Sequence, residues 1–213
     1  MKVAPSIIAA DFSRFHEEIA AVEKAGADLL HLDVMDGVFV PNLTFGPMIV
    51  EAINRISSLE LDAHLMIVNP ERYLDQYIKA GVDWLSFHVE ATEKPEYCIQ
   101  YIKEQDIKVG IALNPETPFE NIKKFVERLD YLLVMTVHPG FCGQKFLSEV
   151  VDKIKEIRNW IEKQRLECIL EVDGGINDTN CRIVRQAGAD IIVAGAGIFK
   201  KSDYKKAIEN LRC

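Results

Sequence analysis

Short apolar runs recur along the chain, separated by segments in which apolar residues fall three or four positions apart. Runs of roughly four to eight mostly apolar residues, bounded by glycine, proline or polar residues, are typical of strands buried on both faces. Apolar residues at positions i, i+3 and i+4 are typical of amphipathic helices, and residues 120–129 and 150–165 show this spacing. The runs that predict strands include residues 3–8, 29–37, 61–68, 107–113, 131–137 and 168–172. Strands and helices are therefore predicted to alternate, as in α/β proteins.

A short repeat marks three corners between a predicted helix and the strand that follows it. Its copies are KAGADLLHLDV (24–34), KAGVDWLSFHV (79–89) and QAGADIIVAGA (186–196). A glycine at the end of each helix takes a positive φ without strain. The spacing of the copies fits multiples of about 27 residues, and eight such units account for the length of the chain. The repeat therefore predicts a (β/α)8 TIM barrel, with these corners before its second, fourth and eighth strands.

The domain organisation follows from the absence of any internal boundary in the sequence. No linker or change in composition divides the chain, so residues 1–213 are predicted to form a single α/β domain. The main alternative fold is a doubly wound open sheet. That fold calls for a glycine-rich phosphate turn after its first strand, and the segment PSIIAADF contains no glycine.

Composition and charge exclude several classes of protein. Hydrophobic residues make up 48% of the chain and charged residues 27%, which is typical of soluble globular proteins. The 25 basic and 33 acidic residues give a net charge of −8, and no long basic cluster indicates a nucleic-acid partner. No apolar run is long enough to span a membrane, and MKVAPSIIAADF does not resemble a signal peptide. Five scattered cysteines without a CxxC pattern predict free thiols in the reducing cytoplasm.

Titratable side chains gather at the carboxyl ends of the predicted strands. The segment LLHLDVMDG places His31 and Asp33 two residues apart, so both face the same side of one strand. His64 lies on the next strand, and Asp173 ends the seventh. In a (β/α)8 barrel these strand ends meet at one mouth, where active sites lie. Burial of two imidazoles and two carboxylates together is costly without a compensating cation, which predicts a divalent metal with N and O ligands.

Other histidines and aspartates carry weaker signals. His88 lies on a predicted strand and is interpreted as a packing residue or as a support for a ligand. His16 falls in a surface helix and receives no role, whereas His138 lies in a loop where substrate contact and no role are equally compatible. Asp36 and Asp178 are predicted to cap helices.

Three consecutive loops in the last third of the chain are rich in glycine. HPGFCGQKF follows the predicted sixth strand, DGG (173–175) follows the seventh, and AGAGIF (194–199) follows the eighth. Glycine loops that open helices present backbone N–H groups to an anion, and the loops after strands 7 and 8 commonly bind phosphate in this fold. These loops predict a phosphorylated ligand held by the main chain, which agrees with the acidic net charge.

Together these segments resemble the ribulose-phosphate 3-epimerase family along essentially the whole chain. The segments that carry the resemblance are PSIIAADF, HLDVMDGVFVPNLTFGP, HLMIVNPE, FHVEAT, GIALNPETP, VMTVHPGFCGQKF, EVDGGIN and VAGAGIF. The resemblance implies a metal-dependent isomerase that inverts carbon 3 of a ketose phosphate, converting D-ribulose 5-phosphate to D-xylulose 5-phosphate in the pentose phosphate pathway. It also implies a cytoplasmic homo-oligomer.

The resemblance assigns roles to individual residues. It implies that His31, Asp33, His64 and Asp173 bind one divalent ion, such as zinc, iron(II), manganese or cobalt, and that Asp33 and Asp173 are the acid/base pair. The substrate contacts that it implies are Ser6, His64, the pocket methionines Met35, Met66 and Met135, and the phosphate-loop residues Gly140, Phe141, Cys142, Gly143, Gly174, Gly175, Gly195 and Ala196.

A mechanism for inversion follows from the chemistry of carbon 3. Its hydrogen is α to the C2 carbonyl, so its removal gives an enediolate whose charge a metal stabilises. Inversion requires the proton to leave one face and return to the other, which needs two acid/base groups. Strands 2 and 7 are expected on different sides of the barrel mouth, so Asp33 and Asp173 are placed to flank the intermediate.

The chain departs from the family pattern at three places. His138 stands where Asn, Asp or Glu is expected, Cys142 replaces a small residue, and Ala196-Gly197 replaces Ser-Ala. These departures leave D-allulose 6-phosphate open as an alternative substrate. A non-catalytic barrel that binds sugar phosphates is a further alternative, whereas a Schiff-base aldolase would need a strand-end lysine, and Lys108 begins its predicted strand.

Overall fold

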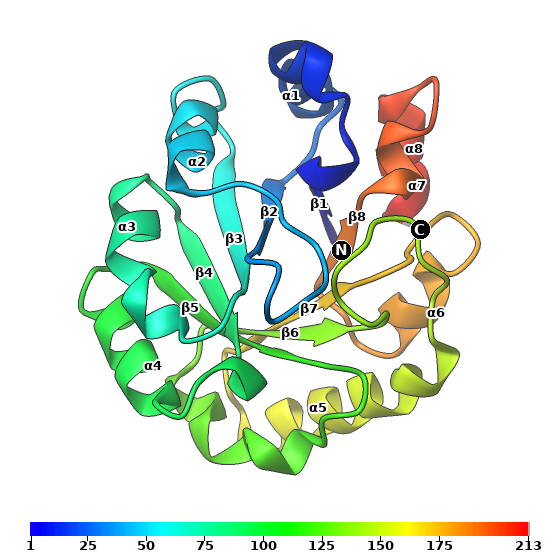
Figure 1. Cartoon of the computed structure of the whole chain (residues 1–213). Coiled ribbons are helices and arrows are strands. Elements are labelled where there is room, and N and C mark those ends of the chain that lie inside the picture. The colour runs from blue at the N-terminus through cyan, green and yellow to red at the C-terminus, as the bar shows by residue number, and fades with distance from the viewer. Residues whose placement is uncertain (213) are drawn as a thin grey trace.

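The computed structural model describes residues 1–212, which form a (β/α)8 barrel (Figure 1). The parallel strands are β1 (Lys2–Pro5), β2 (Leu29–Met35), β3 (Glu60–Met66), β4 (Trp84–His88), β5 (Lys108–Leu113), β6 (Tyr131–Met135), β7 (Ile169–Asp173) and β8 (Ile191–Ala194). They lie in the order β1-β8-β7-β6-β5-β4-β3-β2, and a bridge between Ser6 and His31 joins the first strand to the second. The barrel prediction is confirmed, and the open-sheet alternative is wrong.

Helices surround the strands as an outer ring (Figure 1). They are α1 (Phe15–Lys24), α2 (Pro47–Asn54), α3 (Leu74–Lys79), α4 (Pro95–Lys103), α5 (Val151–Gln164), α6 (Cys181–Gln186), α7 (Ala196–Phe199) and α8 (Tyr204–Leu211). Within residues 1–212, no helix has the length and apolar character needed to cross a membrane. The helix predicted over 150–165 is confirmed as α5, and its apolar face packs on the barrel.

The segment 120–129 was expected to form an α-helix and instead forms 3-10 turns, η5 (Phe119–Asn121) and η6 (Lys123–Arg128). Its apolar positions are buried as the spacing predicts, but the backbone bonds close three residues back, as from Leu129 N to Val126 O (3.1 Å). A 3-10 helix rises about 2.0 Å per residue against 1.5 Å for an α-helix.

The repeated corners adopt the predicted backbone. Gly26, Gly81 and Gly188 have φ values of +90°, +93° and +107° and precede β2, β4 and β8. Several strands are shorter than predicted at their carboxyl ends. β3 ends at Met66 and β6 at Met135, because the chain turns outward there to build the loops of the barrel mouth.

Asp36 and Asp178 do not cap helices, so this prediction is wrong. The Asp36 side chain accepts the N–H groups of Val38 and Phe39 and that of Val68, and it organises a turn after β2. Asp178 lies 3.4 Å from Lys201 Nζ in an exposed ion pair. In both connections the helix begins later than the polar signal suggested, α2 at Pro47 and α6 at Cys181.

The inside of the barrel is divided into an apolar floor and a polar layer above it. Trp84 and Tyr131 pack edge to face at 5.1 Å and fill the floor with other apolar side chains. A Cβ on Gly110 would lie 2.5 Å from the Tyr131 ring, so a glycine on β5 is what admits this ring. Above the floor, buried polar side chains occupy positions that branched apolar residues usually fill in such barrels.

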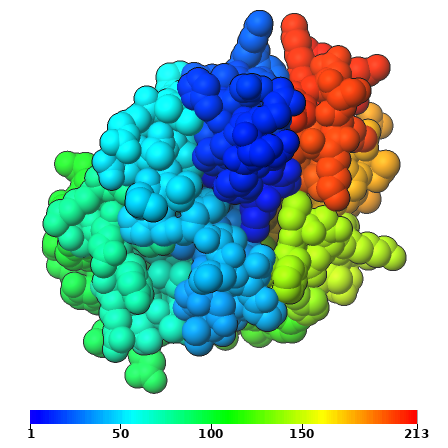
Figure 2. Space-filling model, turned by 45° about the horizontal axis from the view of Figure 1, so that its top comes forward, coloured from blue at the N-terminus to red at the C-terminus, as the bar shows by residue number. Residues whose placement is uncertain are grey.

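The two ends of the described chain lie together. Figure 2 shows the first segment, in dark blue, against the last, in red and orange. Arg212 donates to the carbonyl oxygens of Met1 (3.3 Å) and Gly26 (2.6 Å). Of the cysteines, Cys98, Cys142 and Cys168 carry free thiols, and Cys213 lies outside the described residues.

Candidate active site

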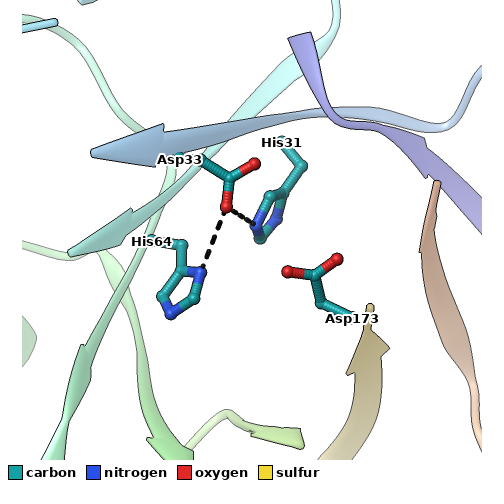
Figure 3. Close-up of side chains that lie close together, drawn as sticks. All are labelled: His31, Asp33, His64 and Asp173. Atoms are coloured by element: carbon teal, nitrogen blue, oxygen red, sulfur yellow. Dashed lines mark ion pairs between the residues drawn. The ribbon is translucent and has the colours of Figure 1, made fainter. Parts of the chain in front are cut away.

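The strands bring the four predicted metal ligands to one place. Figure 3 shows His31 and Asp33 from β2, His64 from β3, and Asp173 from the end of β7, facing one another in the barrel mouth. Because successive side chains of a strand alternate, His31 and Asp33 both point inward. One potential ligand atom from each of the four residues lies within 4.8 Å of the others. The cluster expected from the sequence therefore exists as a geometric group.

Two buried ring nitrogens test whether this group suits a cation. Within the described residues, His31 Nε2 and His64 Nδ1 have no hydrogen-bond partner, although both rings are fully buried. Each lies 3.5 Å from Asp33 Oδ1, as the dashed lines in Figure 3 mark. A buried polar atom without a partner is costly, and a divalent cation supplies a partner to imidazole nitrogens and carboxylate oxygens together. The donor set therefore fits a divalent metal.

The second nitrogen of each histidine is held by a polar neighbour. His31 Nδ1 lies 2.5 Å from Asp62 Oδ2, and the Tyr131 hydroxyl donates to the other Asp62 oxygen (2.9 Å). His64 Nε2 lies 2.9 Å from Nε2 of His88. The first ring is thus backed by a carboxylate, and the second by another imidazole. For His88, the contact favours support of a ligand over simple packing.

Glu171 completes the polar layer beneath the cluster. Its side chain is fully buried, and within residues 1–212 neither carboxylate oxygen has a hydrogen-bond partner. Burial and the nearby charge of Asp62 raise the pKa of Glu171 well above its usual value, which favours the uncharged acid. Glu171, Asp62 and His31 also form a compact group, but the short contact to Asp62 already occupies His31 Nδ1.

The two candidate acid/base groups prefer opposite protonation states. Burial raises the pKa of Asp33, but the contacts with His31 and His64 outweigh it and hold that pKa well below its usual range. Ser6 Oγ also donates a hydrogen bond to Asp33 Oδ2. Burial, followed by the charge of Asp33, raises the pKa of Asp173 to about 7. Carboxylates whose pKa values are driven apart in this way are typical of acid/base pairs.

The ligand histidines differ in charge as well. Burial lowers the pKa of His64 to about 4, so this ring is neutral near pH 7. Burial also opposes charge on His31, but the carboxylates of Asp62 and Asp33 raise its pKa well above the usual value. A cation at the cluster would replace the proton on His31 Nε2, because metal ligands bind in their deprotonated form.

A pocket opens directly above the cluster. The predicted substrate residues that line it are Ser6, Met35, Met66, Met135, Gly140, Phe141, Cys142, Gly143, Gly174, Gly175, Gly195 and Ala196, together with Asp33 and Asp173. His31 and His64 lie below and do not line it. Within the described residues no lysine or arginine lines the pocket, so an anion there would meet main-chain groups.

Glycines build one side of the pocket because side chains do not fit there. Gly174 and Gly175 have φ values of +128° and +64°, and a Cβ on Gly175 would lie 2.6 Å from Phe146 N. Across the mouth, Asn42 Nδ2 donates to Gly140 O (2.7 Å), which ties the loop after β2 to the loop after β6. Figure 2 shows these two segments meeting, in light blue and yellow-green.

Comparison with known proteins identifies the family. Residues 2–199 match the model of the ribulose-phosphate 3-epimerase family. The ribulose-phosphate 3-epimerase of Bacillus subtilis (strain 168) is 50% identical over 213 residues, covering 100% of this chain and 98% of that protein. The ribulose-phosphate 3-epimerase of Escherichia coli (strain K12) is 41% identical over 211 residues, covering 99% and 94%.

The chain belongs to the ribulose-phosphate 3-epimerase family. It is thus an enzyme that acts on carbohydrates, as the sequence predicted. Among solved structures, the chain resembles 3-hexulose-6-phosphate synthase from Salmonella typhimurium with a TM-score of 0.73. The two share 16% sequence identity, and the match covers 99% of this chain and 96% of the other. At that identity, the likeness supports the barrel fold alone.

The three departures from the epimerase family pattern have different surroundings. His138 does not line the pocket and lies 3.0 Å from Glu116 in an exposed ion pair. Cys142 and Ala196 both line the pocket, and a Cβ on Gly195 would lie 3.3 Å from the Cys142 sulfur. The two departures at the glycine loops are therefore neighbours.

Sequence reasoning missed the residues that lie behind the predicted metal ligands. Asp62 precedes His64 by two positions on β3, and Glu171 precedes Asp173 by two positions on β7. The same alternation that paired His31 with Asp33 would have placed both carboxylates inside the barrel. Tyr131 carried no comparable signal, because its partner Asp62 lies on another strand. Glu90 stands two positions after its partner His88, the same spacing as His31 and Asp33, so the sequence did hold a signal for this pair.

Proposed function

We propose that this protein is a metal-dependent 3-epimerase that interconverts D-ribulose 5-phosphate and D-xylulose 5-phosphate in the pentose phosphate pathway. One observation carries the proposal: two carboxylates with opposite proton preferences, Asp33 and Asp173, face one pocket whose far side consists of glycine loops. Membership of the epimerase family and the names of its relatives support it.

His31, Asp33, His64 and Asp173 would hold one divalent ion, such as zinc, iron(II), manganese or cobalt. When bound, that ion supplies Lewis-acid stabilisation of negative charge on the substrate oxygens. The unpartnered nitrogens His31 Nε2 and His64 Nδ1 support this ligand set. The protein contributes the arrangement, since all four side chains are fixed on three strands of one barrel.

Asp33 and Asp173 transfer the proton at carbon 3. The lowered pKa of Asp33 keeps it a carboxylate that accepts a proton, and the raised pKa of Asp173 lets it hold one near neutral pH. One group removes the hydrogen from one face of the substrate, and the other returns a hydrogen to the opposite face. Their positions on β2 and β7 support this division, and the roles exchange in the reverse reaction (Figure 3).

Ser6 and the three methionines prepare the pocket for this chemistry. The Ser6 hydroxyl holds one oxygen of Asp33, which leaves the other oxygen toward the cluster. Met35, Met66 and Met135 are almost fully buried at the base of the pocket. Their apolar, flexible side chains exclude water from a planar intermediate while tolerating its movement.

The glycine loops would seat the phosphate. Their residues are Gly140, Phe141, Cys142, Gly143, Gly174, Gly175, Gly195 and Ala196, and all of them line the pocket. Backbone N–H groups bind phosphate without a lysine or arginine, which suits a protein with a net charge of −8. We further propose that the whole chain acts as one catalytic domain, in a cytoplasmic homo-oligomer.

Turnover in deuterated water tests the function directly. Metal-free protein reloaded separately with Zn²⁺, Fe²⁺, Mn²⁺ or Co²⁺ is incubated with D-ribulose 5-phosphate, and NMR follows xylulose 5-phosphate and deuterium at carbon 3. We expect product carrying solvent deuterium with at least one ion, and loss of turnover on chelation. Binding of the sugar phosphate without product or exchange would instead support a non-catalytic barrel.

One other ketose phosphate is a specific alternative to the proposed substrate. Cys142 and Ala196 alter the side of the pocket where the phosphate would sit, so a longer ketose phosphate remains a candidate. Steady-state kinetics on D-ribulose 5-phosphate and D-allulose 6-phosphate compare the two. A higher kcat/KM for the pentulose is expected, and a large preference for the hexulose would replace it as the substrate.

A further inference from the structure

We propose that Glu90, acting through His88, holds His64 in the single tautomer that leaves its Nδ1 open to a cation. His88 and Glu90 are thus positioning residues, which touch neither the proposed ion nor the substrate. This role depends on the metal site proposed above, but the tautomer itself is a property of the metal-free protein. It is carried by a chain of hydrogen bonds that leads out of the site to the loop after β5.

The first link joins two imidazoles. His64 Nε2 and His88 Nε2 lie 2.9 Å apart, and both rings are fully buried. At that distance one nitrogen donates a proton and the other accepts it, since two N–H groups or two lone pairs would repel. A neutral imidazole carries one N–H. The direction of this hydrogen bond therefore decides which nitrogen of His64 has a lone pair.

Glu90 sets that direction. Its Oε2 lies 3.1 Å from His88 Nδ1, and an ionised carboxylate only accepts hydrogen bonds. His88 Nδ1 is therefore the donor, its Nε2 is the acceptor, and His64 donates from Nε2. His64 Nδ1 is left with a lone pair, and it is this atom that lies 3.5 Å from Asp33 Oδ1 without a hydrogen bond.

The loop after β5 fixes Glu90 in turn. Its second oxygen, Oε1, accepts the backbone N–H of Asn114 (2.9 Å) and the hydroxyl of Thr117. Lys153 on α5 donates to the carbonyl oxygens of Asn114 (2.9 Å) and Pro115 (2.6 Å), which anchors this loop. The acceptor role of Glu90 is therefore imposed by donors outside the site.

His31 needs no such relay. Its Nδ1 contacts the carboxylate of Asp62 directly, so its Nε2 is the nitrogen that faces the cluster. The two ligand histidines thus present opposite ring nitrogens, Nε2 of His31 and Nδ1 of His64. The other nitrogen of His31 contacts the carboxylate of Asp62 directly, and the other nitrogen of His64 is linked to the carboxylate of Glu90 through His88. This difference makes the tautomer of His64 dependent on a residue two steps away.

Glu90→Gln is the decisive variant because it reverses the relay. The backbone N–H of Asn114 cannot change its role, so the Gln oxygen is expected to face it and the amide NH₂ to face His88 Nδ1. His88 would then donate from Nε2, and His64 would carry its proton on Nδ1. The matched control is Glu93→Gln, which makes the same change in charge at an exposed position three residues away.

The measurements use the full-length metal-free protein labelled with ¹⁵N-histidine. Long-range ¹H–¹⁵N NMR reports the tautomers, and calorimetry reports the affinity for Zn²⁺. We expect the wild type to show N–H at His64 Nε2 and the Glu90→Gln variant to show it at Nδ1. The affinity of Glu90→Gln for Zn²⁺ should fall about 10- to 100-fold, in the range known for residues that orient metal ligands. Glu93→Gln should match the wild type in both measurements.

A second pair of variants decides the matter if Glu90→Gln fails to fold. In His88→Gln the amide oxygen can accept a hydrogen bond from His64, and the NH₂ group can donate one to Glu90. Both hydrogen bonds keep the direction they have in the wild type, so the His64 tautomer should be unchanged. His88→Leu removes the acceptor, so a unique His64 tautomer should be lost. A wild-type His64 with N–H on Nδ1, or a folded Glu90→Gln or His88→Leu variant that leaves its tautomer unchanged, would overturn the relay even if Zn²⁺ binds. Wild-type tautomers as expected without Zn²⁺ binding would instead refute the metal site.

Discussion

The two sides of the barrel mouth are built on opposite principles. The histidine side consists of His31, Asp33 and His64 on β2 and β3, with buried polar side chains beneath them. The glycine side consists of the loops after β6, β7 and β8, where Gly174, Gly175 and Gly197 leave no room for a side chain. One side presents charged atoms of side chains, and the other presents the backbone itself.

This difference teaches where each side is vulnerable. Burial of charged groups on the histidine side is tolerable only with matching partners, so a change of charge or hydrogen bonding should be costly there. On the glycine side, close backbone contacts leave no space, so a change of volume should be costly. Asp173 joins the two, since it ends β7 at the start of a glycine loop and faces the histidines.

The largest effect is expected where the two sides meet. Asp173→Asn and Asp33→Asn should each lower kcat by about 10²- to 10⁴-fold, because a neutral amide neither accepts nor donates the proton at carbon 3. Steady-state kinetics and deuterium exchange measure the loss, and circular dichroism checks that the fold persists. Asp178→Asn, at an exposed ion pair with Lys201, is the matched control and should keep full turnover. Near-wild-type turnover in either site variant would contradict the two-base mechanism.

A methyl group on the glycine side should have the next largest effect. Gly175→Ala forces a side chain into a φ of +64° and places Cβ 2.6 Å from Phe146 N and 2.8 Å from Gln144 O. Strain and overlap together should lower the free energy of unfolding by about 2–4 kcal/mol. KM for a sugar phosphate should rise, while the affinity for Zn²⁺ stays within experimental error.

Gly26→Ala is the matched control for this glycine. It has a φ of +90°, but a Cβ there would meet no atom within 4 Å, so only backbone strain of about 1–2 kcal/mol applies. Chemical denaturation compares the two variants, and kinetics compares their KM. Equal losses of stability with unchanged KM in both would show that the glycine side is not shaped by close contact.

The barrel could be predicted from local pattern alone because its units repeat. The corners at Gly26, Gly81 and Gly188 gave both the backbone conformation and the length of the unit. The type of the 120–129 connection could not be predicted in the same way. Its apolar spacing is compatible with an α-helix, and that spacing does not distinguish hydrogen bonds that close three residues back from those that close four residues back.

The candidate site likewise contains residues that could be predicted from local pattern and residues that could not. His31, Asp33, His64 and Asp173 were accessible because strand ends of one barrel must meet. The contact from Tyr131 to Asp62 could not be predicted from the sequence, because it spans the inside of the barrel and requires Gly110 to make room for the ring. Side-chain contacts that form by packing across the barrel produce no periodic pattern in the sequence.

Tyr131→Phe should produce a moderate effect on the histidine side. It removes the hydroxyl that donates to Asp62 Oδ1 (2.9 Å) and keeps the ring that packs on Trp84. The lost hydrogen bond to a buried carboxylate should lower the free energy of unfolding by about 1–3 kcal/mol. The affinity for Zn²⁺ should fall less than in Glu90→Gln, because Asp62 keeps its contact with His31. Tyr77→Phe, at another buried tyrosine, is the control.

Calorimetry and denaturation measure the two quantities separately. If Tyr131→Phe and Tyr77→Phe lose equal stability and bind Zn²⁺ equally well, the hydroxyl of Tyr131 has no special part in the histidine side. A loss of Zn²⁺ affinity without a loss of stability would show that the Tyr131 hydroxyl acts on the proposed metal ligand His31 rather than on the stability of the fold.

Asp36 offers the smallest effect and marks the outer edge of the histidine side. It directly follows the last residue of β2, the strand that carries His31 and Asp33. Its carboxylate, however, accepts hydrogen bonds from the backbone N–H groups of Val38, Phe39 and Val68. Burial raises the pKa of Asp36, but these hydrogen bonds outweigh it and lower the pKa below its usual value of 3.8. Asp36→Asn should therefore leave turnover and Zn²⁺ affinity unchanged and lower the free energy of unfolding at pH 7 by about 1 kcal/mol.

The pH dependence of this difference separates the backbone role from a catalytic one. Because the folded state lowers the pKa, the stability that Asp36 adds is present above pH 3.8 and is lost as pH falls through the lowered pKa. A protonated Asp36 and an Asn both place a donor against a backbone N–H, so wild type and Asp36→Asn should converge in acid. Denaturation from pH 7 downward measures the convergence. A difference that persists in acid would show that the stability does not come from the carboxylate charge of Asp36. A variant that loses turnover would show that Asp36 takes part in catalysis rather than only holding the three N–H groups.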